Sequence, residues 1–171
     1  MTEPEEIVWQ GKFITARTRG KWEYVSRARG ISAAVILAVH DNAVILVEQF
    51  RVPLGRPCIE LPAGLIGDDE SGEAPELAAV RELEEETGFR AGRMENLGQF
   101  YSSPGMVSEA FHLMRAHDLV RVHDGGGVEG ENISVHVVQL DALESFLADK
   151  RAQGCGMDVK LLLLLGARML G

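Results

Sequence analysis

The sequence contains little of what many specialised proteins depend on. Only two of its 171 residues are cysteines, Cys58 and Cys155, and they lie far apart without a CxxC pair, so we expect reduced thiols rather than a disulfide framework. Basic residues number 17 against 26 acidic ones, and the net charge of −9 argues against a nucleic-acid backbone as partner. No zinc-site spacing such as HxxxH or HExxH joins the histidines. We expect structural or exposed roles for all five: His40, His112, His117, His123 and His136.

No apolar run is long enough to cross a membrane. The leucine-rich end, residues 159–170, is shorter than the about 20 residues that a spanning helix needs, and Lys160 and Arg168 interrupt it. We expect a buried terminal helix there, packed on a sheet. The first ten residues, MTEPEEIVWQ, are acidic and lack the apolar core of a secretory signal. We therefore expect a cytoplasmic protein that does not use a membrane as partner.

Composition and patterning indicate one domain over residues 1–171. Hydrophobic residues make up 46% of the chain, and no linker rich in Pro, Ser or Gly divides it. Alternating or β-branched segments predict strands at residues 7–18, 22–27, 32–39, 43–50, 95–102, 110–117 and 133–140. The first two are expected to form a hairpin across Arg19-Gly20-Lys21, and Asp41-Asn42 is a turn signal between the next two. Helices are expected at 75–87, at 141–150 with Asp141 as N-cap, and at the leucine-rich end.

Four glutamates crowd the end of the helix expected at 75–87: Glu82, Glu84, Glu85 and Glu86. This end carries the negative pole of the helix dipole, and like charges at i,i+4 repel by roughly 0.2–0.5 kcal/mol per pair. At about 100° per residue, Glu82, Glu85 and Glu86 share one arc, whereas Glu84 lies away from it and is not counted as a ligand. Arg81 can orient Glu85 from i,i+4.

The opposite arc of this helix, Leu77, Val80 and Leu83, is expected to pack inward. Charge runs usually mark solvent-exposed surface. The alternative is that oxygen ligands hold a divalent cation, and this use would explain why a sequence accepts self-repelling charges.

The spacing around these glutamates resembles the Nudix box at every fixed position. The pattern runs from Gly67 over five residues to Glu73, then over seven residues to Arg81-Glu82-Leu83-x-Glu85-Glu86-x-Gly88-Phe89. The resemblance implies the Nudix fold, an α/β/α sandwich around a mixed β-sheet, here with an N-terminal β-hairpin extension. It also implies hydrolysis, dependent on Mg²⁺ with Mn²⁺ as a substitute, of a nucleoside diphosphate linked to another moiety.

A second segment, Glu60-Leu61-Pro62-Ala63-Gly64, resembles the ExPAG segment of ADP-ribose pyrophosphatases. The resemblance implies that the Ala63 carbonyl completes a metal site with Glu82, Glu86 and Glu85. The chain departs from that group in one respect. There the glycine of the PAG sequence is usually also the first glycine of the box, whereas here three extra residues intervene and Gly67 occupies the first position of the box. The loop over residues 65–72 is therefore enlarged. We expect its acids to face solvent: Asp68, Asp69 and Glu70.

Further resemblances concern the substrate. Pro104, fifteen residues beyond Phe89, matches the downstream proline of the ADP-ribose group, which implies sugar contacts from Met106 and Glu109. Arg51 in EQFR resembles the arginine that contacts the diphosphate. The remaining candidates for substrate binding are Arg27, Arg29, Glu60, Trp9 and Trp22. Either tryptophan could stack on a purine, or bury its surface in the core or at a dimer interface; in the resembling enzymes the N-terminal strands, here residues 1–30, help to form a homodimer.

The glycine-rich, acidic loop over residues 125–131 suggests a closing catalytic loop, with an exposed turn as the alternative. The resemblance implies that Glu129 or Glu131 activates water or adds a metal ligand, and both stay open. The string GGGVE also resembles GDP-mannose hydrolases. We therefore expect hydrolysis of ADP-ribose or a related nucleoside diphosphate sugar to a nucleoside monophosphate and a sugar phosphate. The alternatives are preference for GDP-mannose and a Nudix-like sensor that binds such a ligand without turnover.

Overall fold

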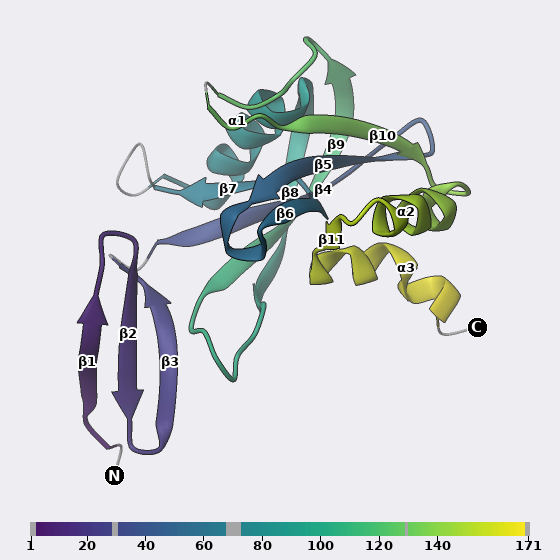
Figure 1. The fold of residues 1–171 in the computed structure, drawn as a ribbon. Coiled ribbons are helices and arrows are strands. Elements are labelled where there is room, and N and C mark those ends of the chain that lie inside the picture. Colours follow the sequence, from purple (N-terminus) through teal and green to yellow (C-terminus); the bar gives the residue numbers. More distant parts are fainter. Residues whose placement is uncertain (1–2, 29–30, 68–72, 129, 170–171) are drawn as a thin grey trace.

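A computed structural model describes residues 3–28, 31–67, 73–128 and 130–169. The candidates Arg29, Asp68, Asp69, Glu70 and Glu129 lie outside these ranges. The described chain forms a small antiparallel sheet at the N-terminus and a larger body of strands and helices (Figure 1).

The N-terminal sheet has three strands and lies at one side of the body (Figure 1), to which it is joined by backbone hydrogen bonds of Val25 with Met106 and Ser108. Its order is β1 (Glu5–Gln10), β2 (Ile14–Arg19) and β3 (Trp22–Arg27). The expected hairpin is present as β2 and β3, with Gly20 at a left-handed φ of 59° in its turn. The single strand expected over 7–18 was wrong, because the chain turns between β1 and β2, where the Gly11 N–H donates to the Ile14 carbonyl at 2.9 Å.

The main sheet has the order β11-β6-β5-β4-β9-β8, with β10 added to β5 and β7 added to β4. The pairs β4–β9 and β6–β11 are parallel and the others are antiparallel, so the sheet is mixed, as expected. The strands are β4 (Ser32–His40), β5 (Ala43–Arg51), β6 (Arg56–Glu60), β7 (Ala63–Ile66), β8 (Phe89–Tyr101), β9 (Ala110–Arg121), β10 (Ser134–Gln139) and β11 (Gly156–Met157).

Several strand bounds differ from the sequence prediction. The segment expected at 95–102 is only the second half of β8, and β9 extends beyond the expected end at residue 117. The strands β6, β7 and β11 were not predicted; they have five, four and two residues, too few for a clear alternation. The predicted turn at Asp41 and Asn42 is confirmed, because both have a left-handed φ, of 48° and 60°.

Helices cover both faces of the sheet, as the sandwich predicts. Successive residues of a strand point to opposite faces, and Ala34 packs in one core cluster while Val35 packs in the other. The first cluster includes Ala79 and Leu83 of α1 (Pro75–Thr87). The second includes Leu147 of α2 (Leu143–Ala152), together with residues of the 3₁₀ helix η3 (Val159–Leu161) and of α3 (Leu162–Met169).

Three details of the helices correct the prediction. Leu77 is 64% exposed, and the buried residues of α1 are Ala78, Ala79, Leu83, Glu86 and Thr87. The N-cap of α2 is Ala142, without a side-chain hydrogen bond, rather than Asp141. The terminal helix is only half-buried, because Leu162 and Leu163 are each 49% exposed. Within the described ranges, no helix has the length and apolar character needed to cross a membrane.

Candidate functional site

A cleft of about 620 Å³ gathers most of the residues that the sequence singled out. It lies where the bend at Leu61-Pro62 carries the chain from β6 to β7 beside α1. The predicted site residues that line it are Arg27, Arg51, Glu60, Ala63, Arg81, Glu82, Glu85, Glu86, Glu109 and Glu131. Acidic and basic side chains from six or more segments of the sequence thus share one hollow.

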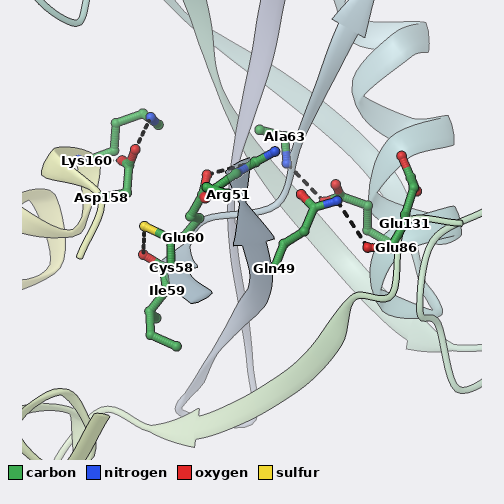
Figure 2. Close-up of polar contacts among 10 residues, drawn as sticks. All are labelled: Gln49, Arg51, Cys58, Ile59, Glu60, Ala63, Glu86, Glu131, Asp158 and Lys160. Carbon is green, nitrogen blue, oxygen red and sulfur yellow. Dashed lines mark hydrogen bonds and ion pairs between the residues drawn. The ribbon is translucent and has the colours of Figure 1, made fainter. Parts of the chain in front are cut away.

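Glu86 is the buried acid of this cleft. The inward arc of α1 includes it, and it is only 6% exposed. The Ala63 N–H, at the start of β7, donates to Glu86 Oε2 at 3.0 Å (Figure 2). Burial, opposed by the Ala63 hydrogen bond and reinforced by the charges of Glu82 and Glu131, raises the pKa of the Glu86 carboxyl to about 8. Burial likewise raises the pKa of Glu82.

Arg81 neutralises the other acids of the cluster. Its Nη1 lies 2.9 Å from Glu82 Oε1 and 3.3 Å from Glu85 Oε2, so the predicted i,i+4 contact is present. Its Nη2 lies 3.5 Å from Glu73 Oε2, and Glu73 also accepts a hydrogen bond from the Gly67 N–H at 3.3 Å. Glu84 instead pairs with Arg90 through two contacts of 2.8 Å, in agreement with its exclusion from the cluster.

The donor set fits a hard divalent cation. Carboxylates of Glu82, Glu85 and Glu86 and the Ala63 carbonyl are oxygen ligands of the kind that Mg²⁺ prefers. Gly64 supports this fit, because a Cβ at this position would overlap the Glu82 carboxyl group. In the arrangement seen, Glu82 and Glu85 bond to Arg81, and no three acidic, His or Cys side chains among the described residues converge as metal ligands. A cation would therefore compete with Arg81 for these carboxylates.

Two arginines of the cleft are each held by a glutamate. Arg51 forms a two-point contact with Glu60, Nε to Oε1 at 2.6 Å and Nη2 to Oε2 at 2.9 Å (Figure 2). This contact raises the pKa of the Arg51 guanidinium. Arg27 pairs with Glu109. Since Glu60 is only 7% exposed, its geometry suits orientation of Arg51 better than direct contact with a substrate.

The structure does not bring every candidate into this cleft. Trp22 is exposed and lines a second hollow of about 760 Å³ with Arg17, Arg19 and Tyr24, between the N-terminal sheet and residues 104–108. Arg27 lines both hollows. Trp9 and Met106 line neither, and both are exposed. Substrate roles for these residues stay predictions.

Among the lining residues of the cleft that the prediction missed are Gln49 and Lys160. The Gln49 side-chain amide donates to the Glu131 carbonyl at 3.3 Å. Lys160 pairs with Asp158 at 2.7 Å and lies 5.6 Å from the centre of the Phe111 ring (Figure 2 shows the pair). A signal existed for Lys160, since a lone lysine among leucines needs a polar partner, but it was interpreted only as an interruption of an apolar run.

Residues 28–154 match the family model of the NUDIX domain. The chain belongs to the Nudix family. It is 47% identical over 115 residues to an ADP-ribose pyrophosphatase of Bacillus subtilis (strain 168), a match that covers 66% of this chain and 60% of the relative. It is 41% identical over 146 residues to a GDP-mannose pyrophosphatase of Cronobacter sakazakii, covering 80% of this chain and 72% of the relative.

A solved structure described as an ADP compounds hydrolase has the same Nudix fold. Its TM-score is 0.72 at 24% identity, over 100% of this chain and 94% of that one. At this identity the likeness concerns the fold alone. The chain spans less than two thirds of the length of several curated relatives, including 64% of one and 60% of another.

The burial of Glu86 generates a pH prediction for the metal-free protein. The folded-state pKa of about 8 lies above the ordinary 4.5, so between these values the folded state holds a proton that the unfolded chain releases. Protonation of Glu86 therefore increases the free energy of unfolding. This stabilisation has its full value below about pH 4.5 and is lost as the pH rises through about 8. Urea denaturation with a chelator, at about pH 5 and about pH 8, measures the loss. Glu86→Gln should reduce it; an identical pH dependence in that variant would contradict the assignment.

Proposed function

We propose that this Nudix protein is a metal-dependent pyrophosphohydrolase that cleaves ADP-ribose or a related nucleoside diphosphate sugar to a nucleoside monophosphate and a sugar phosphate. The observation that carries the proposal is the pairing of opposite charges in one cleft, where Glu82, Glu85 and Glu86 share the hollow with Arg51 and Arg27. Carboxylates suit a cation and guanidinium groups suit phosphate oxygens, so together they suit a cation–diphosphate complex.

The names of the relatives support the substrate class. The Bacillus subtilis relative is an ADP-ribose pyrophosphatase and the Cronobacter relative is a GDP-mannose pyrophosphatase. Both names denote cleavage of a diphosphate that links a nucleoside to a sugar. The same names keep GDP-mannose as the second candidate substrate, together with the GGGVE string at residues 125–129.

The cation-binding residues in this proposal are Glu82, Glu85, Glu86 and the Ala63 carbonyl, with Mg²⁺ as the ion and Mn²⁺ as a substitute. When bound, such a cation neutralises the charge on the diphosphate oxygens and favours attack on phosphorus. Arg51 binds the diphosphate and is oriented by Glu60; Arg27, paired with Glu109, is a weaker candidate for the same role. Arg81 holds Glu85 and balances the charge of the cluster.

Proton transfer is assigned to the loop acid. Glu131 lines the cleft, and its charge acts on both Glu82 and Glu86. A carboxylate in this place can accept the proton of an attacking water, a role that typically contributes a factor of about 10²–10⁴. Glu129 remains the alternative acid. Positioning and charge neutralisation supply the rest of the rate enhancement, so no Ser or Cys nucleophile is required.

We also propose that the protein is a homodimer formed through the N-terminal sheet. Large apolar side chains are exposed on β1, on β2 and in the turn between them: Ile7, Val8, Trp9, Phe13 and Ile14. The strand order β1-β2-β3 puts β1 at the outer edge of the sheet, whereas β3 bonds to the body through Val25 (Figure 1). Exposed large apolar side chains gathered on one small sheet favour association. Purine stacking on Trp22 or Trp9, sugar contacts from Met106 and Glu109, and a cytoplasmic location complete the proposal.

A substrate panel tests the proposed reaction. We expect Mg²⁺-dependent hydrolysis of ADP-ribose, with AMP and ribose phosphate as products resolved by chromatography, and slower hydrolysis of NADH and nucleoside triphosphates. Faster hydrolysis of GDP-mannose would select the second candidate. Tight binding of these compounds without turnover would instead identify the sensor, and preference for a triphosphate would overturn the substrate class.

Glu86→Gln tests the cation site. The substitution removes a buried carboxylate ligand but keeps the size of the side chain, so turnover of ADP-ribose should fall by orders of magnitude, with a higher Mg²⁺ concentration needed for half-maximal rate. Glu84→Gln is the matched control, because Glu84 lies on the same helix and pairs with Arg90. It should leave turnover and the Mg²⁺ requirement unchanged. Equal activity of the two variants would show that the cluster does not act as proposed.

Val8→Glu tests the dimer. Val8 is 67% exposed on β1, and a charge there would be buried without a partner in an apolar interface. We expect sedimentation velocity to show a dimer for the unaltered protein and a monomer for the variant at the same concentration. Val120→Glu, at an exposed apolar position of β9 in the body, should remain a dimer. A monomeric unaltered protein would contradict the proposal.

A further inference from the structure

The glycine-rich loop is bonded to the end of the helix that carries the acidic cluster. The Gly126 N–H donates to the Glu86 carbonyl at 2.8 Å, and the Gly127 N–H donates to the Glu85 carbonyl at 3.0 Å. The final carbonyls of a helix have no partner within the helix and form its negative pole. Two backbone N–H groups of the loop therefore satisfy the carbonyls of two residues whose side chains line the cleft.

Contact between the two backbones is close enough to require glycine. At Gly125, where φ is 74°, a Cβ would lie 2.6 Å from the Glu86 carbonyl oxygen and would overlap the backbone of Thr87. The Gly88 carbonyl, just beyond α1, accepts a hydrogen bond from the Val122 N–H at 2.8 Å. The described part of the loop is thus fixed to α1. In the arrangement seen, its glycines serve close approach and left-handed conformations.

Gly127 has a separate relation to Glu131. The Glu131 carboxylate folds back and accepts the Val128 N–H at 2.9 Å through Oε2. A Cβ on Gly127 would overlap this same Oε2 atom and would lie 3.1 Å from the Glu131 Cβ. The backbone of Glu131 is held from the other side, where its carbonyl accepts the Gln49 amide at 3.3 Å (Figure 2). The missing side chain at Gly127 is therefore what leaves space for the carboxylate of Glu131.

We propose that Gly127 is a positioning residue that acts through Glu131: its N–H ties the loop to α1, and its lack of a side chain lets the Glu131 carboxylate lie over the loop at the cleft. The helix acids and the loop acid are in this way held in one arrangement by backbone contacts. The catalytic part of the inference rests on the proposed function. The structural part, the hydrogen bond between Glu131 and the Val128 N–H, stands independently.

A double-mutant cycle with ADP-ribose and Mg²⁺ tests the catalytic part. We expect Gly127→Ala to lower kcat by about 100-fold with KM unchanged, the loss typical of a group displaced by about 1 Å. Glu131→Ala should lose at least as much. The double variant should be at most about twofold slower than Glu131→Ala, because both substitutions remove the same function. Gly154→Ala, at a left-handed φ of 90° with no atom near the new Cβ and outside the cleft, should keep full activity.

Amide hydrogen exchange, followed by NMR, tests the structural part without turnover. Glu131→Ala should speed exchange of the Val128 N–H and leave the Gly126 N–H protected by the Glu86 carbonyl, and Gly127→Ala should have the same effect at Val128. Unchanged Val128 exchange in Glu131→Ala would overturn the proposal even if Gly127→Ala did not fold. Additive losses of kcat, or full activity of Gly127→Ala, would overturn the catalytic part. If no variant or unaltered protein hydrolysed ADP-ribose, the proposed function would fail while the exchange result still decided the positioning.

Discussion

The buried carboxylate of Glu86 is the constraint on which the rest of the cleft depends. It lies in the last turn of α1, where the negative pole of the helix and the charge of Glu82 both oppose its ionisation. Packing of α1 on the sheet through Ala79 and Leu83 forces it inward. A buried charge without a partner is costly, so the carboxyl must either keep a proton or share its charge with a cation. Both responses link the state of this side chain to the stability of the fold.

The surroundings of Glu86 reduce this cost without cancelling its charge. The bend between β6 and β7 presents the Ala63 N–H to the carboxylate, and the Gly126 N–H satisfies the carbonyl of the same residue. Arg81 balances the charges of Glu82 and Glu85. The charges at the rim of the cluster are thereby balanced, whereas the buried Glu86 carboxyl keeps its proton until a cation replaces it. This distribution suits a site that exchanges a fixed cation for a bound one.

Sequence reasoning reached the parts of the molecule that are local in the chain. The helix at Pro75–Thr87 and the acids on it follow from proline, glycine and charge within 15 or so residues. The bounds of β6 and β7 and the depth of Glu86 depend on contacts between distant segments, and the Leu77 error shows this. Propensity and spacing locate an arc on a helix, but the sheet decides which arc is buried. Similarly, nothing local indicates that Gln49 meets Glu131, since their contact joins β5 to a loop 82 residues later.

The glycine loop shows that a glycine-rich composition has more than one structural use. A run of glycines beside acids predicts mobility, because glycine is the residue with the largest backbone freedom. The same freedom allows left-handed φ values of 74°, 115° and 76° at three successive residues, which place two N–H groups on the end of α1. Ordering these glycines in the folded state costs conformational entropy. The two hydrogen bonds, and their favourable interaction with the negative end of the helix dipole, must offset this cost. Only the positions of α1 and the loop relative to each other distinguish these two uses of glycine.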